Sequence, residues 1–245
     1  DVERALLLRE LLKRGFRIGK VATLSISRLK NLFNESSSGL TMTAENTAPA
    51  DVRRAMELVA LQRWIELRSF VAEIPHSDPR RLVAEFILPA MKTLAMSVAT
   101  GMISISQEHI FSSFLKEKIY SALTELDRNR AEEKSRHRFV LAAPEGDFHE
   151  IGLLLAHLIL RARAFTSLYI GAHTPAVDLA ETALRFGASH VLVVSTISKS
   201  GGARQDILAY VRDLQKTIGD RPEILLAGNQ VPHLGEQKGS ALVGI

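Results

Sequence analysis

The second half of the chain alternates short apolar runs with segments of helical periodicity, and this alternation limits the folds open to it. The apolar runs predict strands at 138–143, 167–171, 190–195 and 223–228, with a short fifth strand at 241–244. The intervening segments predict helices at about 150–164, 175–187, 203–217 and 230–237. Strands that are apolar almost throughout are typical of a parallel sheet covered on both faces. We therefore expect residues 131–245 to form a doubly wound, Rossmann-like domain.

Residues 51–130 have helical periodicity throughout and predict a four-helix bundle. In the first helix Met56, Val59, Ala60 and Arg63 fall at helical spacing, and Trp64 closes this stripe. The helical pattern is interrupted before a predicted helix from Arg80 to about Ala99, in which Pro89 predicts a kink. Ser104 and Gln107 form a capping box for the last helix. The apolar stripe of that helix comprises Phe111, Leu115, Ile119, Ala122 and Leu126. Short connections between helices are typical of bundles.

The N-terminal segment, residues 1–33, is basic and helical. It carries eight Lys or Arg residues against three acidic ones, whereas the whole chain has a net charge of +4. A basic end on a nearly neutral body indicates proximity to a polyanion, although a solvated helix face has the same composition. Gly15 ends a first helix, and Ser25 caps a helix that runs to Phe33. Residues 34–50 are polar and small, and we predict a linker there.

The remaining composition excludes several classes of protein. No apolar run reaches about 18 residues, so we expect no membrane span. The chain has no cysteine, which excludes disulfides and thiolate metal sites and suits a cytoplasmic protein. No Gly-x-Gly-x-x-Gly follows the first predicted strand, so dinucleotide binding is disfavoured. No nucleophile–base or acid–base arrangement indicates independent catalysis, and we expect a protein that is not an enzyme.

The first predicted strand is followed by Asp147, His149 and Gly152 in the pattern Asp-x-His-x-x-Gly. The carboxyl end of a strand is where open α/β sheets bind their ligands. A neutral imidazole there can bind a transition metal, and a carboxylate two residues away can fix its tautomer. Gly152 removes a side chain from the first turn of the next helix, so a bulky group can lie against the backbone. The alternative is a loop histidine hydrogen-bonded to a nearby acid.

This pattern resembles the cobalamin-binding signature. The resemblance implies that His149 is the lower axial ligand of the cobalt of cobalamin, with adenosylcobalamin or another upper-ligand form as the cofactor. It also implies contacts to the nucleotide tail from Ser195 and Ile197, which resemble the family's Ser-x-Leu/Val element, and from Gly228. Ala227 stands where the family usually has a glycine, and its methyl group is expected at a point of close approach.

Glu108 and His109, on the last helix of the bundle, extend the resemblance. The sequence Glu108-His109-x-x-Ser112 before a cobalamin signature is similar to the sensor region of CarH/LitR-type light-sensing regulators. Residues 1–33 likewise resemble the end of a MerR-type DNA-binding domain, which would contact DNA through residues upstream of this chain. The resemblance implies that Glu108 and His109 face the upper axial group, and that the bundles pair, so we expect a homo-oligomer.

Val98 and Ala99 depart from that family, which has a tryptophan and then a histidine at these positions. The tryptophan caps the adenosyl group, and the histidine takes over cobalt after illumination. Valine at this candidate cofactor-binding position cannot stack as an indole does, and alanine cannot bind a metal. The resemblance therefore implies cobalamin binding through His149 without establishing a light response.

Three functions fit these features. The first is a transcriptional regulator in which cobalamin binding changes oligomerisation and DNA binding. The second is a corrinoid carrier protein of a methyltransferase system, which also combines a helical bundle with a cobalamin domain. The third is a regulator that keeps the fold without the cofactor. The basic N-terminal segment favours the first hypothesis over the second, because a carrier has no need of it.

Overall fold

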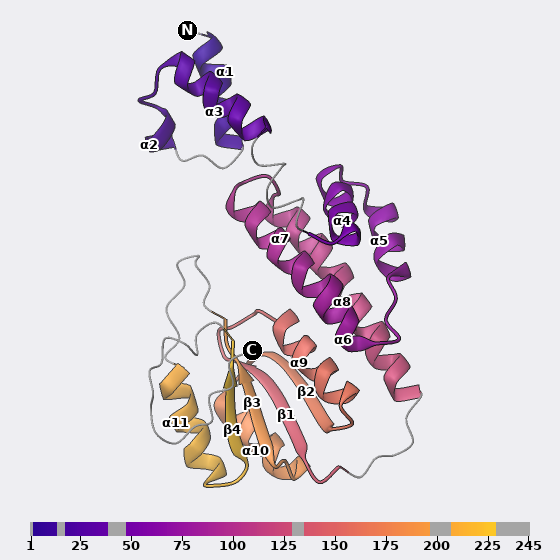
Figure 1. Cartoon of the computed structure of the whole chain (residues 1–245). Coiled ribbons are helices and arrows are strands. Elements are labelled where there is room, and N and C mark those ends of the chain that lie inside the picture. The colour runs from indigo at the N-terminus through magenta and orange to yellow at the C-terminus, as the bar shows by residue number, and fades with distance from the viewer. Residues whose placement is uncertain (1, 14–17, 39–47, 129–134, 197–206, 229–245) are drawn as a thin grey trace. The chain divides into compact units, whose positions relative to one another are not determined.

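The computed structural model describes residues 2–13, 18–38, 48–128, 135–196 and 207–228 (Figure 1). The chain divides into two compact units, Asp1–Lys118 and Ile119–Ile245. This boundary falls inside the last bundle helix, before the end of the bundle predicted at residue 130.

Within the described residues of the second unit, four parallel strands form a sheet in the order β2-β1-β3-β4 (Figure 1). The strands are β1 (Arg138–Pro144), β2 (Thr166–Thr174), β3 (His190–Val194) and β4 (Glu223–Ala227). The predicted strands are confirmed to within a few residues. The predicted fifth strand at 241–244 and the helix at 230–237 lie outside the described residues. The strand order reverses direction between β1 and β3, which makes their carboxyl ends the topological switch point.

Helices cover both faces of this sheet, as the apolar character of its strands predicts. The helices are α9 (Ile151–Ala162), α10 (Ala176–Phe186) and α11 (Ile207–Ile218). Val140 and Ala142 of β1 pack with α10 and α11, whereas Leu141 and Ala143 pack on the other face with Leu153 of α9. The doubly wound α/β fold is therefore confirmed.

Strand β2 is longer than predicted because its pairing with β1 is irregular. The register shifts between Leu141 and Ala142 and again between Ala142 and Pro144, so that Ala142 pairs with Gly171 and Pro144 with Thr174. Extra residues on β2 form bulges, which redirect a strand at the edge of its pairing. The C-terminal end of β2 is thereby directed to the loop that follows β1.

In the first unit, helices α4 to α7 and the part of α8 up to Lys118 form the predicted bundle. Their bounds are α4 (Ala50–Ala60), α5 (Trp64–Glu73), α6 (Pro79–Arg81), the π-helical segment η1 (Leu82–Ile87), α7 (Leu88–Ala99) and α8 (Ile105–Arg128). Part of the first predicted stripe is wrong, since Met56 and Val59 are buried but Ala60 and Arg63 are exposed. The cause is a break at Gln62, whose φ is 56°. A new helix then begins at Trp64.

The helix ends of the bundle follow the predicted side-chain chemistry. The backbone N–H of Ser104 donates to Gln107 Oε1 at 2.9 Å, and the N–H of Gln107 donates back to Ser104 Oγ at 3.3 Å. This confirms the capping box. Pro89 lies in the first turn of α7, directly after η1, where its missing N–H is tolerated. The π-helical segment thus marks the predicted irregularity.

One stretch of the described residues, Pro79–Ala99, is long and apolar enough to cross a membrane by length and composition alone, with mean hydropathy 1.5. This differs from the expectation of no span. The finding carries little weight, because the core helix of a bundle satisfies the same criterion.

The N-terminal helices are α1 (Val2–Lys13), α2 (Ile18–Val21) and α3 (Ile26–Ser38). Leu11, Val21 and Leu29 are buried against one another, and Arg28 N–H lies 3.4 Å from the capping Ser25 Oγ. Helix α3 continues to Ser38, so the predicted linker begins too early at residue 34. Helix α4 then begins at Ala50, at the end of the predicted linker.

Candidate functional site

The loop between β1 and α9 is organised around the buried carboxylate of Asp147, which is 7% exposed. One oxygen, Oδ1, accepts the backbone N–H of His149 at 3.0 Å and lies 2.9 Å from His149 Nδ1. The other, Oδ2, accepts the backbone N–H of Thr196 at 2.7 Å, and the Ser195 hydroxyl donates to it at 3.4 Å. The carboxylate therefore joins the ends of β1 and β3 at the switch point.

The imidazole of His149 is fixed on one side and open on the other. Because a carboxylate oxygen is an acceptor only, its contact with Nδ1 places the ring proton on Nδ1 and leaves the lone pair on Nε2. The His149 side chain is 52% exposed. Within the described residues, Nε2 has no hydrogen-bond partner. The contact between Asp147 and His149 predicted from the sequence is thus present, and it leaves the lone pair of Nε2 available.

The backbone of the same loop is held from the end of β2. The N–H of Asp147 donates to the carbonyl of Pro144 at 2.9 Å, and the N–H of His173 donates to the carbonyl of Asp147 at 3.0 Å. The N–H of Gly146 donates to His173 Nδ1 at 2.8 Å. The sequence analysis predicted none of these contacts of His173 with the loop.

Two glycines of the predicted site differ in what the chain itself requires of them. A Cβ on Gly152 would lie 3.8 Å from Val194 Cγ1, an ordinary contact, so the fold does not require glycine there. A Cβ on Gly228, whose φ is +106°, would lie 2.1 Å from the carbonyl oxygen of Ser195. The fold therefore requires glycine at position 228. It does not require glycine at position 152, which is consistent with a bulky group lying against Gly152.

Ala227 is 4% exposed and packs in the core with Leu141 and Leu153. Its expected approach to a nucleotide tail stays a prediction. Of the predicted tail contacts, Ser195 is 3% exposed and directs its hydroxyl to Asp147. Ile197 lies outside the described residues.

Glu150 adds a polar contact beside His149 that the sequence did not reveal. Its Oε1 accepts a hydrogen bond from the Tyr169 hydroxyl at 2.6 Å. Burial and then the neighbouring Glu150 carboxylate raise the pKa of Tyr169, so the phenol remains a donor. This bond ties the first residue after His149 to β2.

The candidate residues of the bundle lie in the first unit. Glu108 is partly buried, accepts the Ser112 hydroxyl at 2.7 Å and lies 2.5 Å from His109 Nδ1. The His109 side chain is 73% exposed. Val98 is half-buried and Ala99 is exposed near the end of α7. The Glu-His pair is thus formed, and its predicted role toward a cofactor stays a prediction.

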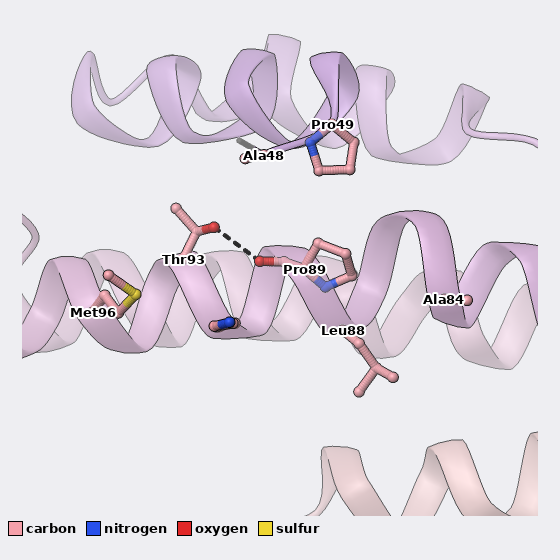
Figure 2. A pocket seen from close by; sticks show the side chains of 8 residues that line it. Ala48, Pro49, Ala84, Leu88, Pro89, Thr93 and Met96 are labelled. Atoms are coloured by element: carbon pink, nitrogen blue, oxygen red, sulfur yellow. Dashed lines mark hydrogen bonds between the residues drawn. The ribbon is translucent and has the colours of Figure 1, made fainter. Parts of the chain in front are cut away.

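A pocket of about 510 Å³ lies in the first unit, along η1 and α7 and beside Pro49 (Figure 2). It is lined by Pro49, Ala84, Leu88, Lys92, Thr93 and Met96 among others, and Thr93 donates to the Pro89 carbonyl at 2.9 Å. None of the predicted site residues lines it.

Among the residues that the structure describes, no group of three or more His, Asp or Glu side chains could hold a metal ion. The contact of His149 Nδ1 with Asp147 leaves one imidazole nitrogen, Nε2, as a donor. A metal held in a macrocycle takes a single histidine of this kind from a protein, so the donor fits a corrinoid.

Comparison with known proteins gives the following likenesses. No family model matches the chain. The chain is 26% identical over 212 residues to the HTH-type transcriptional repressor CarH of Myxococcus xanthus, covering 84% of this chain and 68% of the repressor. The structure is similar to the monomethylamine corrinoid protein of Methanosarcina barkeri, with a TM-score of 0.56, 16% identity, and coverage of 78% of this chain and 89% of that one. A cobalamin-binding protein from Desulfitobacterium hafniense matches with a TM-score of 0.35 and 16% identity over 72% of this chain and 83% of that one. The likeness to the corrinoid protein shows the fold.

Proposed function

We propose that the chain is the sensor region of a cytoplasmic transcriptional regulator. It binds cobalamin with His149 as the lower axial ligand of cobalt and thereby alters self-association and DNA binding. Bound cobalamin would supply a cobalt ion able to accept one imidazole nitrogen, and His149 is the residue that would provide it. The proposal assigns no reaction to the chain.

The observation that carries the proposal is the imidazole of His149, which is held at Nδ1 by Asp147 and has an unbonded Nε2 within the described residues. Its Nδ1 contacts Asp147 at 2.9 Å, and that carboxylate is in turn bound by Thr196 and Ser195. Outer partners of this kind fix the orientation of a metal-binding histidine and raise its basicity. Gly152 supports the same reading, because the fold itself does not need a glycine at that position.

Two further observations support a regulator. The likeness to a DNA-binding repressor covers most of the chain. The N-terminal segment is basic, which suits a position next to DNA. We leave light out of the proposal because Val98 and Ala99 cannot perform the capping and ligand exchange that the resemblance would require.

Binding can be tested by colour. The full chain is mixed in the dark with hydroxocobalamin, methylcobalamin or adenosylcobalamin, freed of unbound cofactor, and its absorption spectrum is recorded. We expect a coloured protein whose spectrum loses the imidazole contribution in His149→Ala. His137→Ala is the control, because that histidine is exposed and precedes the opposite end of β1. A colourless wild-type protein with all three forms would refute cobalamin binding.

The regulatory part needs a separate experiment. With the upstream residues restored, electrophoretic mobility shifts of operator DNA are compared with and without cobalamin. Coupling requires that the ligand bind one assembly state better than the other, so the apparent DNA affinity must change. An unchanged affinity with bound cofactor would leave a cobalamin protein without this regulatory function.

The second candidate is a corrinoid carrier, which the likeness in fold to a corrinoid protein favours. A carrier should form methylcobalamin from the reduced cofactor when supplied with a methyl donor and its transferase. Under the sensor proposal the measurable output is DNA binding, whether or not the cofactor is methylated. The third candidate, a cofactor-free regulator, predicts a colourless protein with intact DNA binding.

A further inference from the structure

His173 contacts three successive residues of the loop that carries His149. Its Nδ1 accepts the backbone N–H of Gly146 at 2.8 Å. Its own N–H donates to the carbonyl of Asp147 at 3.0 Å. Its ring stacks on Phe148, with ring centroids 4.9 Å apart and an interplanar angle of 13°. One side chain and its backbone thus contact Gly146, Asp147 and Phe148, the three residues that precede His149.

The backbone of His173 is in an unfavourable conformation. Its φ is 53°, in the left-handed region that side chains other than glycine rarely occupy. It lies two residues after Gly171, in the irregular end of β2 where the register with β1 shifts before Pro144 pairs with Thr174. Bulges and strained residues of this kind cluster where a side chain must be aimed at a functional site. The contacts to the loop are what this conformation achieves.

We propose that His173 is a positioning residue for His149, an inference that rests on the proposed function. The carboxylate of Asp147, which fixes the imidazole of His149, is held by Thr196 and Ser195 at the end of β3. The backbone of Asp147 is held by His173 at the end of β2. Since the imidazole takes its orientation from Asp147, both neighbouring strands are needed to direct Nε2 outward.

The tautomer of His173 follows from the same contacts. Because Nδ1 accepts the N–H of Gly146, the ring proton is on Nε2. His173 therefore presents a donor to solvent, whereas His149 presents a lone pair. This difference makes His149, and not His173, the residue of the pair that can bind a metal.

The test uses two substitutions of the full chain that differ in one respect. His173→Gly removes the acceptor and the ring but suits the left-handed backbone. His173→Asn restores an acceptor at nearly the position of Nδ1, and asparagine also tolerates that backbone. Comparing the two separates the hydrogen bond to Gly146 from backbone strain. Thermal unfolding of both proteins checks that they remain folded.

Two readouts report on His149 directly. In the protein without cofactor, nitrogen NMR of the labelled histidines gives the tautomer of His149. In the protein loaded with cob(II)alamin, electron paramagnetic resonance detects the axial nitrogen, and isotopic labelling of histidine distinguishes a protein imidazole from the base of the cofactor. The dissociation constant for hydroxocobalamin is measured by absorbance.

We expect His173→Gly to mix the two tautomers of His149, to reduce the histidine signal at cobalt, and to weaken cobalamin binding about tenfold, with His173→Asn within about threefold of wild type. Wild-type behaviour of His173→Gly in all three measurements would overturn the inference. A folded Asn variant that behaves like the Gly variant would also overturn it, because the acceptor would then be irrelevant.

Failure of the proposed function looks different. If wild-type protein showed no histidine nitrogen at cobalt, His149 would not be the ligand, and the proposed function would be refuted. The tautomer of His149 in the protein without cofactor would still show whether His173 orients it.

Discussion

Replacing Asp147 by asparagine is the sharpest test of how the candidate site is built. The carboxylate accepts from two donors on each oxygen, and an amide of the same shape has one acceptor oxygen and one NH2 group. In either orientation the NH2 group therefore faces a backbone N–H. If the NH2 faces β3, the N–H of Thr196 at 2.7 Å is left without an acceptor. If it faces His149, the N–H of that exposed residue is the one displaced.

The second orientation costs less, because it keeps the 2.7 Å bond from the Thr196 N–H, and the displaced N–H belongs to a residue whose side chain is 52% exposed. The NH2 group of the introduced asparagine would then donate to His149 Nδ1, which moves the ring proton to Nε2. We expect the α/β unit to lose about 1–3 kcal/mol of stability, from the lost charge-assisted bond and the weakened pairing. Cobalamin binding should weaken by about 10- to 100-fold, because the metal-binding nitrogen is now protonated.

Hydrogen exchange measured by mass spectrometry gives the stability of the β1–α9 region in the full chain, and absorbance titration with hydroxocobalamin gives the affinity. Asp220→Asn, on an exposed turn, is the control for the charge change. If Asp147→Asn exchanged like the control and bound cobalamin as wild type does, Asp147 would not be organising the loop, and the reasoning would be refuted.

Three other substitutions have expected outcomes. Gly152→Ala should raise the stability of the cofactor-free protein by about 0.5 kcal/mol, because alanine favours helix and meets only Val194 at 3.8 Å, yet should weaken cobalamin binding; equal affinity would show that nothing bulky lies there. Gly228→Ala should lower the melting temperature markedly and disturb His149, because its Cβ would lie 2.1 Å from the Ser195 carbonyl oxygen; a melting temperature like that of wild type would contradict this close approach. Burial and then Arg161 lower the pKa of His157 to about 4, so the stability contributed by the neutral ring should be full above about pH 6.5 and fall as pH drops toward 4. The loss should be less than about 1.4 kcal/mol per pH unit, because the ring is partly exposed. Denaturation at several pH values should show a weaker pH dependence in His157→Gln.

The sequence predicts much of this architecture because its strands are apolar runs and its capping signals are local. The contact between Asp147 and His149 was predictable because the two residues are only two positions apart in the sequence. The break at Gln62 was not, since neither glycine nor proline marks it, and φ there is set by the packing of two helices.

The long-range partners of the loop were also beyond sequence reasoning. Thr196 contributes a backbone N–H, which every residue except proline has, so no letter in the sequence indicates the contact. His173 reaches the loop only because the pairing of β1 and β2 is irregular, and hydrophobic periodicity does not encode a bulge. Gly171, whose φ is +123°, was a usable signal of that irregularity.

The order in which the strands are made has a consequence for when a ribosome-bound chain can first hold the cofactor. Asp147 leaves the ribosome early, but the residues that hold it at the ends of β2 and β3 follow much later, with Thr196 last. A nascent chain that ends before Thr196 would carry the whole Asp-x-His-x-x-Gly motif and still lack a fixed imidazole. We therefore expect the chain to bind cobalamin only after β3 has been synthesised and the sheet has been assembled.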